Sequence, residues 1–252
     1  MIDIDTVRAN GWQLEVHDCL PSTSDECIAR AEHGEPAGLA VLARRQTRAR
    51  GSRGRSWSEP ASGNLAVSVL LRPDADLLTP AVWPFIAGLA LHQALSGTPA
   101  IGARLQLKWP NDVMLDGRKL AGILVERGHG GGRDWLVIGF GANLAAAPEL
   151  PGRAAACMAE LGAPAAPEAV AARLLASLDD WCAVWRREGF DAIKAAWLAR
   201  AHPVGTPLFV TMHGVERVGC FAGLGADGAL LLRGDDGEQR IDTGEILMLV
   251  GS

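Results

Sequence analysis

The first two thirds of the chain alternate between short apolar runs and segments in which apolar residues recur at helical spacing. Residues 39–42 and 64–71 are predominantly apolar over strand length, which predicts two buried strands. Residues 23–32 begin with Thr-Ser-Asp-Glu, the pattern of a capping box, and end just before Gly34, so they predict a helix. A further strand is expected over residues 105–109, because a proline follows them.

Two more helices are predicted by apolar stripes at three- and four-residue spacing. The first opens at Thr79-Pro80, and its stripe consists of Val82, Phe85, Ile86 and Leu89. The second follows Pro167, and one of its faces consists of Leu174, Leu178, Trp181 and Trp185. Between these helices, residues 119–126 and 135–139 have strand character and predict a hairpin.

After His202-Pro203 the pattern changes to short alternating runs separated by Gly and Asp-Gly turns, which is typical of a small all-β unit. The runs are Leu208–Met212, Val218–Phe221, Leu230–Leu232 and Ile246–Val250. We therefore expect a larger domain over residues 1–203 and a small β barrel or sandwich over residues 204–252.

Composition narrows the class of protein. The 252 residues are 48% hydrophobic and 21% charged, which suits one large globular domain with a small appendage. The net charge of -5 disfavours a general nucleic-acid-binding protein, because such proteins are usually basic. The N-terminus lacks the pattern of a signal peptide, and no segment is apolar enough to span a membrane. The five cysteines are widely spaced without a CxxC pair, so we expect reduced thiols and a cytoplasmic protein.

Two kinds of site find little support. The tract Gly128–Gly132 lacks the GxxxxGK[ST] pattern of a phosphate-binding loop, and it lies between two expected strands, so we interpret it as a flexible hairpin tip. No Ser/His/Asp or Cys/His arrangement stands out, which disfavours covalent nucleophilic catalysis.

The segments Lys108–Asp112 and Lys119–Leu124 place two lysines, an amide and a carboxylate close together on an expected strand, turn and strand. Such a group suits a reaction between a carboxylate and a triphosphate, because the lysines offset the repulsion between the anions. The alternatives are structural: Lys119 as an exposed lysine at a strand edge, and Asn111 as a turn residue.

A second basic segment, Gln46–Trp57, has small residues interleaved with arginines. Small residues let the backbone approach an anion, and the arginine fork matches a phosphate. The arginines are Arg48, Arg50, Arg53 and Arg55. The alternatives are a solvated basic loop and an RNA-binding tract, which are disfavoured because this is a single tract inside an acidic chain.

In this order, the two basic segments resemble those of the biotin protein ligases, which join biotin to carrier proteins. The stretch Gly139–Asn143 is similar to the Gly-x-Gly-x-Asn of that family, and segments 225–232 and 244–246 are similar to its closing β domain. The resemblance covers nearly the whole chain from Ser22 onward. It implies an α+β fold with a mixed, largely antiparallel sheet, flanking helices and a small SH3-like β-barrel.

The resemblance also implies roles for particular residues. The catalytic residues would be Lys119, Arg50, Lys108 and Asp112. The biotin-binding residues would be Ser22, Thr23, Ser24, Gln46, Arg50, Gly51, Ser52, Lys119 and Gly122. The ATP- and adenylate-binding residues would be Arg53, Arg55, Trp57, Asn111 and Asn143.

By the same resemblance, Lys119 contacts the biotin carboxylate and then the adenylate phosphate, while Lys108 steadies the leaving pyrophosphate. Asp112 either helps to hold Mg²⁺ or orients the acceptor lysine. Ser22-Thr23-Ser24 binds the ureido ring, and at least one of these hydroxyls also caps the helix. Gly122 allows the ligand to approach the backbone.

The chain departs from the family pattern in the basic loop. Ala49 replaces a glycine, which is tolerable if the backbone φ there is negative. Ser52 replaces an arginine, so we expect the acyl-adenylate to be held less tightly than in relatives with that arginine. Ser24, in place of an asparagine, is a milder departure.

The implied activity has two steps, with ATP and Mg²⁺ as cofactors and biotin as a substrate. Biotin and ATP form biotinyl-5′-AMP, and one lysine of a biotin carboxyl carrier domain then receives the biotin. Because the pattern begins at Ser22, we expect no winged helix and no operator binding. We also expect a monomer or weak homodimer. Two alternatives stay open: a lipoate ligase with the same chemistry, and a protein that binds biotin or its adenylate with weak transfer.

Overall fold

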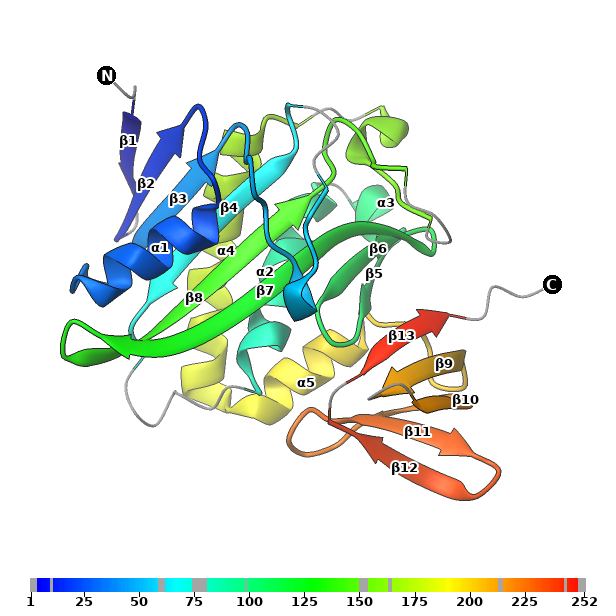
Figure 1. The fold of residues 1–252 in the computed structure, drawn as a ribbon. Coiled ribbons are helices and arrows are strands. Elements are labelled where there is room, and N and C mark those ends of the chain that lie inside the picture. The colour runs from blue at the N-terminus through cyan, green and yellow to red at the C-terminus, as the bar shows by residue number, and fades with distance from the viewer. Residues whose placement is uncertain are drawn as a thin grey trace.

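The computed structural model describes residues 4–9, 11–58, 62–73, 81–97, 99–149, 154–162, 165–212, 215–242 and 244–248. Its larger part is built on one eight-stranded sheet (Figure 1). The strands are β1 (Ile4–Ala9), β2 (Trp12–His17), β3 (Leu39–Ala43), β4 (Leu65–Leu71), β5 (Leu105–Lys108), β6 (Asp112–Leu115), β7 (Arg118–Gly130) and β8 (Arg133–Ala142). Their order is β1-β2-β3-β4-β8-β7-β6-β5, and only β2 and β3 pair in parallel.

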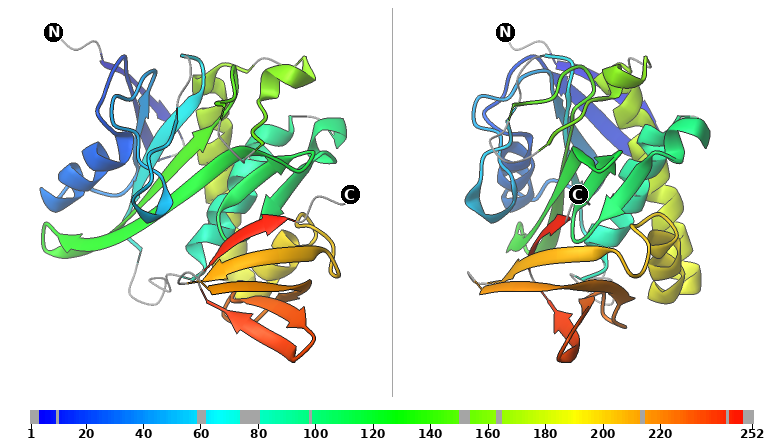
Figure 2. Two further views of the ribbon diagram at one scale, coloured as in Figure 1. Left: turned by 45° about the vertical axis from the view of Figure 1, so that its right-hand side comes forward. Right: turned by 90° about the vertical axis from the view of Figure 1, so that its right-hand side faces the viewer.

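Helices cover both faces of this sheet, α1 on one face and α2, α4 and α5 on the other (Figure 2). The helices are α1 (Thr23–Glu32), α2 (Trp83–Ser96), α3 (Pro99–Gly102), α4 (Pro167–Glu188) and α5 (Phe190–Leu198), with short 3₁₀ turns η1 (Ser52–Gly54) and η3 (Met158–Leu161). The described part of the chain contains no helix with the length and hydropathy needed to cross a bilayer. The α+β class and the mixed, largely antiparallel sheet agree with the prediction.

The main core lies between the sheet and the helices α2, α4 and α5. Aromatic rings lock these helices together, as in the edge-to-face contacts of Trp83 with Trp185 and of Phe85 with Trp197. A smaller apolar cluster lies under α1 and includes Cys27 and Val137. Beyond the N-terminus of α1, this second face of the sheet lines a cavity.

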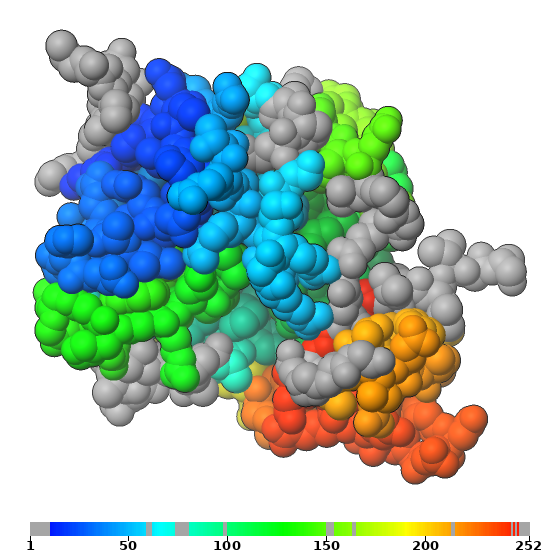
Figure 3. Space-filling model, viewed as in Figure 1, coloured from blue at the N-terminus to red at the C-terminus, as the bar shows by residue number. Residues whose placement is uncertain are grey.

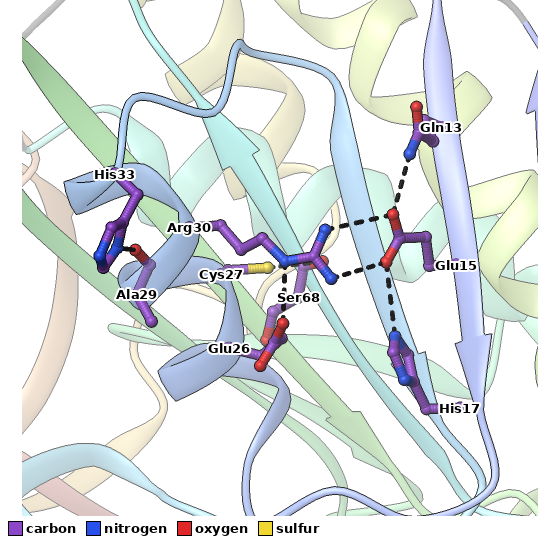
Figure 4. A network of polar contacts seen from close by, with 9 residues as sticks. All are labelled: Gln13, Glu15, His17, Glu26, Cys27, Ala29, Arg30, His33 and Ser68. Carbon is purple, nitrogen blue, oxygen red and sulfur yellow. Dashed lines mark hydrogen bonds and ion pairs between the residues drawn. The ribbon is translucent and has the colours of Figure 1, made fainter. Parts of the chain in front are cut away.

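The N-terminus of α1 is fixed by a side-chain cap. Ser22 accepts a hydrogen bond from the backbone N–H of Asp25 at 3.3 Å, so the cap lies one residue before the capping box predicted from the sequence. Farther along α1, Arg30 donates to both carboxylate oxygens of the buried Glu15 on β2 and pairs with Glu26 (Figure 4). Burial by itself would raise the pKa of Glu15. The hydrogen bonds from Gln13 and Arg30 outweigh burial, so the pKa of this carboxyl is lowered.

The β7–β8 hairpin was predicted, and the structure shows that both strands are longer than expected. Its tip packs against the end of α1. A Cβ atom built on Gly131 would lie 2.4 Å from the Cα atom of Gly34. The guanidinium of Arg72 donates to carbonyls on both sides of this contact, including those of Ala31 and Gly130. The tip glycines therefore permit close packing, beyond the turn role given to them from the sequence.

The C-terminal part is a five-stranded antiparallel sheet in the order β12-β11-β10-β9-β13. Its strands are β9 (Pro207–Met212), β10 (Val215–Leu224), β11 (Leu230–Gly234), β12 (Gly237–Ile241) and β13 (Glu245–Met248). Among the described residues β12 and β13 form opposite edges and do not pair, so the sheet is open and the expected closed barrel is not observed. We propose a domain boundary near residue 203, between the end of α5 and the start of β9.

Most of the remaining elements predicted from the sequence are present, and some elements of the fold were not predicted. The strands at 39–42, 64–71 and 105–109 and the helix after Pro167 are confirmed, with ends shifted by one residue or less where the strands are concerned. The helix carrying the Val82 stripe is present but begins at Trp83, and Thr79-Pro80 lies outside the described residues. The elements that were not predicted are the strands β1, β2, β6 and β12 and the helices α3 and α5.

Two buried histidines predict a loss of stability in acid. Burial lowers the pKa of His92 and of His202 to about 4, below the ordinary value of 6.5. Between these two values the unfolded chain binds more protons than the folded chain, so stability falls as the pH falls. Each histidine contributes roughly 2 kcal/mol to the expected loss between pH 7 and pH 5.

Urea unfolding of the wild type and of His202→Phe at pH 7 and pH 5 measures this effect. His202 contacts the ring of Phe221 and has no hydrogen-bond partner on either ring nitrogen, so phenylalanine keeps the packing. The variant is expected to lose less stability on acidification. An identical loss in both proteins would contradict the prediction.

Candidate functional site

A cavity of about 930 Å³ opens on the face of the sheet that carries α1. Its walls are the N-terminus of α1, the basic loop, the β5–β6 turn, β7, β8 and the C-terminal sheet. In the space-filling view the basic loop crosses the front of the molecule, above the C-terminal sheet (Figure 3). Every site residue proposed from the sequence lines the cavity except Ser22, which is buried as the helix cap.

Strand pairing explains how distant parts of the sequence meet in this cavity. Lys108 on β5 lies opposite Asp112 on β6, Asp112 lies opposite Gly122 on β7, and Gly122 lies opposite Gly141 on β8. These residues form one row across four strands. The row places two charged side chains beside two positions without side chains, so charge and open space adjoin.

The charged group at the end of this row is compact. The ammonium of Lys119 donates to Asp112 Oδ1 at 2.6 Å, and the ammonium of Lys108 lies 3.9 Å from Oδ2. The Asp112 side chain is 15% exposed, so these charges interact more strongly than they would at an open surface. The described lining contains no other carboxylate. The cluster therefore has one net positive charge, which suits an anionic ligand.

Asn111 has a structural role in addition to its place on the lining. Its side-chain amide donates to the carbonyl of Ile123 at 2.6 Å, and the N–H of Ile123 donates to the carbonyl of Asn111 at 2.9 Å. Asn111 therefore ties the β5–β6 turn to β7, in agreement with the turn alternative left open from the sequence.

The indole ring of Trp57 lies against Gly122 and Gly141, the two glycines of this row. A Cβ atom on Gly122 or Gly141 would approach its ring to 3.1 Å or 2.7 Å, and its indole N–H is buried without a protein partner. The ammonium of Lys119 lies 5.6 Å from the ring centroid. Gly122 thus makes room for the indole of Trp57, in addition to any ligand.

The basic loop is closed by its own backbone. The N–H of Gly51 donates to the carbonyl of Arg55 at 2.7 Å, and that of Trp57 donates to Ala49 at 3.0 Å. The φ of Ala49 is negative, so the alanine is tolerated as the sequence analysis required. Arg53, in contrast, has a φ of 61°, in the left-handed region that favours glycine.

The arginines of this loop bind protein groups around the cavity. Arg50 pairs with Asp25 of α1 at 2.8 Å and with Glu126 of β7. Arg53 donates to the carbonyl of Gly244 in the C-terminal sheet. Arg55 donates to its neighbour Ser52. Arg50 and Arg53 therefore connect the loop to both ends of the cavity.

A cluster of buried hydroxyls lies at the end of the cavity nearest α1. The Oγ1 atom of Thr23 lies 2.8 Å from Ser68 Oγ, which lies 3.0 Å from Ser24 Oγ. Gln46 Oε1 accepts from the N–H of Thr23 at 2.9 Å. Gly139 lies opposite Ser68 in the sheet, and a Cβ atom there would lie 2.6 Å from Ser24 Oγ.

An unpaired acceptor lies on the lining near the start of β7. Asn143 donates its side-chain amide to the carbonyl of Ala156, but its Oδ1 atom is buried without a partner. The next residues are clamped by Asn64, whose Oδ1 accepts from the N–H of Leu144, Ala145 and Ala146. Asn143 is thus held rigidly and offers its acceptor to a donor on a ligand.

Asp112 is the carboxylate on the described cavity lining that could bind a metal ion. Within the described ranges no group of three or more His, Cys, Asp or Glu side chains could hold an ion. Magnesium ions are often bound by one or two carboxylates together with substrate phosphates and water. Asp112 fits that pattern as a single carboxylate at the cavity wall.

Several residues around the site were not predicted from the sequence. Ser68 is a polar residue in the middle of an apolar strand, and this position was a signal that was available. Asn64 at the start of the same strand gave no comparable signal. Gly244 and Ile246 belong to a segment that was matched to the closing β domain, but nothing in the sequence showed that they line the cavity.

The comparisons with known proteins agree with this geometry. Residues 17–143 match the biotin/lipoate A/B protein ligase family. The chain is 40% identical to a biotin–[acetyl-CoA-carboxylase] ligase of Paracoccus denitrificans, over 89% of this chain and 96% of that protein. It is 35% identical to a biotin–[acetyl-CoA-carboxylase] ligase of Mycobacterium tuberculosis, over 83% and 79%.

A solved structure extends the likeness to three dimensions. The biotin protein ligase from Aquifex aeolicus in complex with biotin and ATP superposes with a TM-score of 0.75 at 26% identity, covering 94% of this chain and 98% of that one. The chain belongs to the biotin/lipoate A/B protein ligase family.

Proposed function

We propose that this protein activates biotin with ATP as biotinyl-5′-AMP and transfers the biotin to one lysine of a biotin carboxyl carrier domain. The observation that supports this most directly is the difference between the polar groups at the two ends of the cavity. One end presents the hydroxyl cluster of Thr23, Ser24 and Ser68, which suits a ring with polar N–H and C=O groups. The other end presents two lysines, which suit a carboxylate and a triphosphate.

In the first step a carboxylate oxygen of biotin forms a bond to the α-phosphorus of ATP, and the bond to pyrophosphate breaks. Lys119 offsets the charge that builds up on the α-phosphate, and Lys108 neutralises the departing pyrophosphate. Both ammoniums are oriented beforehand by Asp112, so little reorganisation is needed when the anions arrive. Arg53 and Arg55 of the basic loop line the same cavity and extend the positive surface for the phosphates.

Mg²⁺ would be bound by Asp112 together with ATP phosphates. When bound, it supplies positive charge that withdraws electrons from the phosphates and stabilises the leaving group. The unpaired Oδ1 of Asn143 would accept a hydrogen bond from the adenine amino group or a ribose hydroxyl.

In the second step the ε-amine of the carrier lysine attacks the carbonyl carbon of the mixed anhydride, and AMP leaves. The indole of Trp57 and the backbone of the basic loop cover the cavity, which excludes the water that would otherwise hydrolyse the anhydride. The proposed partner is a carrier domain of a biotin-dependent carboxylase, and the enzyme is proposed to be a cytoplasmic monomer or weak homodimer.

The proposal is tested by incubating the protein with biotin, MgATP and a biotin carboxyl carrier domain. We expect the mass of one added biotin on the carrier, and biotin as the preferred acid when lipoate competes. Preference for lipoate would favour the lipoate-ligase alternative. Binding of biotin and ATP without transfer would mean a protein that only retains the ligand or its adenylate.

Ser52→Arg is expected to slow the dissociation of biotinyl-5′-AMP. Ser52 lies on the cavity wall, 3.5 Å from the Arg55 guanidinium, so an arginine there adds a phosphate-directed fork. One charge-assisted hydrogen bond corresponds to roughly a tenfold slower release. Release of the purified intermediate is followed by a chase with unlabelled biotin and ATP, and equal rates in both proteins would contradict the prediction.

A further inference from the structure

Ser68 is buried behind the cavity wall and is fully inaccessible to solvent. It lies in β4 between apolar neighbours and opposite Gly139 of β8. Its Oγ atom contacts the hydroxyls of Thr23 and Ser24, both of which line the cavity. Ser68 therefore touches the proposed biotin-binding hydroxyls without facing the ligand space itself.

The direction of the hydrogen bonds in this cluster follows from counting protons. The backbone N–H of Thr23 can only donate, so the Gln46 atom that it meets at 2.9 Å is an acceptor, the amide oxygen. The hydroxyl of Thr23, 3.3 Å from the same oxygen, must therefore donate to it. A hydroxyl has one proton, so in the contact between Thr23 and Ser68 the donor is Ser68.

The same count fixes the next bond. Ser68 donates to Thr23, so it can only accept from Ser24. The hydroxyl proton of Ser24 thus points inward, away from the cavity, and the lone pairs of its oxygen are left for a ligand. A chain of three donors ends at Gln46 and turns this wall of the cavity into an acceptor surface.

We propose that Ser68 is a positioning residue that sets biotin specificity, because it holds the Ser24 and Thr23 hydroxyls as acceptors for the ring N–H groups of a cyclic urea. A dithiolane ring, as in lipoate, has no N–H group and leaves these acceptors unpaired. Rejection of such a ring follows, since a buried polar group without a partner is costly. This inference rests on the proposed function and names the residue behind its choice of acid.

Gly139 supports the same assignment from the neighbouring strand. A Cβ atom at this position would lie 2.6 Å from Ser24 Oγ and 3.3 Å from Ser68 Oγ. The hydroxyl chain therefore needs a serine on β4 and an empty position on β8 directly opposite. Three elements, α1, β4 and β8, meet at the cluster, and among the residues that the structure describes only Ser68 is hydrogen-bonded to the hydroxyls of both Thr23 and Ser24.

The test compares equilibrium binding of biotin, desthiobiotin, lipoate and ATP to the wild type and to Ser68→Ala. Desthiobiotin keeps the cyclic urea and lacks the sulfur ring. We expect both ureas to bind about tenfold more weakly to the variant, because the Ser24 hydroxyl loses its fixed direction. ATP affinity is expected to stay unchanged, and the preference for biotin over lipoate should fall. Ser177→Ala is the matched control, since Ser177 is a buried serine on α4, behind the opposite face of the sheet.

The outcomes separate the inference from the function beneath it. Equal biotin affinity in Ser68→Ala and the wild type, or equal loss for biotin and ATP, would overturn the positioning role alone. A wild type that binds no biotin would overturn the proposed function and the inference with it. Ser68→Cys is measured as well, because it keeps an acceptor and a weak donor; it is expected to bind biotin with an affinity between those of serine and alanine. It replaces the alanine variant if that variant does not fold.

Discussion

Lys119→Ala is expected to abolish formation of biotinyl-5′-AMP almost completely. Removal of one preorganised charge from the site of a developing anion slows catalysis by about 10²–10³-fold. The loss here should lie at the upper end of this range. The variant also leaves the side chain of Asp112, with its negative charge, without its nearest cation, directly beside the phosphate path.

The measurement is pyrophosphate release in single turnover, with carrier labelling as a second readout. The chain has three lysines, and the third, Lys194, pairs with Asp191 on α5 and does not line the cavity, so Lys194→Ala is the matched control. Lys119→Arg keeps the charge but not the compact ammonium, and should recover only part of the rate. Pyrophosphate release at the wild-type rate in Lys119→Ala would show that another group stabilises the α-phosphate.

Gly131→Ala is expected to lower the free energy of unfolding by about 2–4 kcal/mol, a large share of the stability of a domain. Its φ is 61°, and the added Cβ atom would lie 2.4 Å from the Cα atom of Gly34 and 2.7 Å from its nitrogen. Backbone atoms cannot move aside as a flexible side chain can. The hairpin tip or the end of α1 must shift, and the carbonyls that Arg72 holds shift with it.

The neighbouring glycine supplies the control. Gly132 has a φ of 76°, but a Cβ atom there meets nothing within 4 Å. Gly132→Ala should therefore cost only about 1 kcal/mol, the conformational part of the effect. Urea unfolding of both variants separates the cost of the positive φ, which both share, from the cost of the steric clash with Gly34, which only Gly131→Ala has. Similar losses in the two variants would show that the contact with Gly34 is unimportant.

The sequence was a good guide where local chemistry decides the outcome. The lysines, the aspartate and the two GxG glycines were singled out from short segments, and strand pairing brings Lys108, Asp112, Gly122 and Gly141 into one row. The apolar runs of β3 and β4 were equally plain. The motifs and the apolar runs depend on residues within a few positions of one another, whereas the row itself depends on the pairing of four strands.

The sequence was a poor guide where a distant residue decides. Strand β2 was missed because Glu15 and His17 look unsuited to a buried face, and the guanidinium that compensates Glu15 belongs to Arg30 on α1. Ser68 was passed over for the same reason, because its partners are two hydroxyls far back in the chain. The alternation predicted only a small β barrel or sandwich, and the closed barrel was implied by the family resemblance; alternation does not determine which strands pair.

The C-terminal β unit is hydrogen-bonded to two walls of the cavity, the β5–β6 turn and the basic loop. The indole N–H of Trp109 donates to the carbonyl of Gly228 at 3.0 Å, and Arg53 of the basic loop donates to Gly244. Local unfolding of this β unit would therefore break both hydrogen bonds and release two walls of the cavity at once. Its local unfolding is thus coupled to the assembly of the site. Ligand binding then has a remote effect: by mass action, saturation with the adenylate should slow amide hydrogen exchange in β10 and β11, strands that contribute no residue to the cavity.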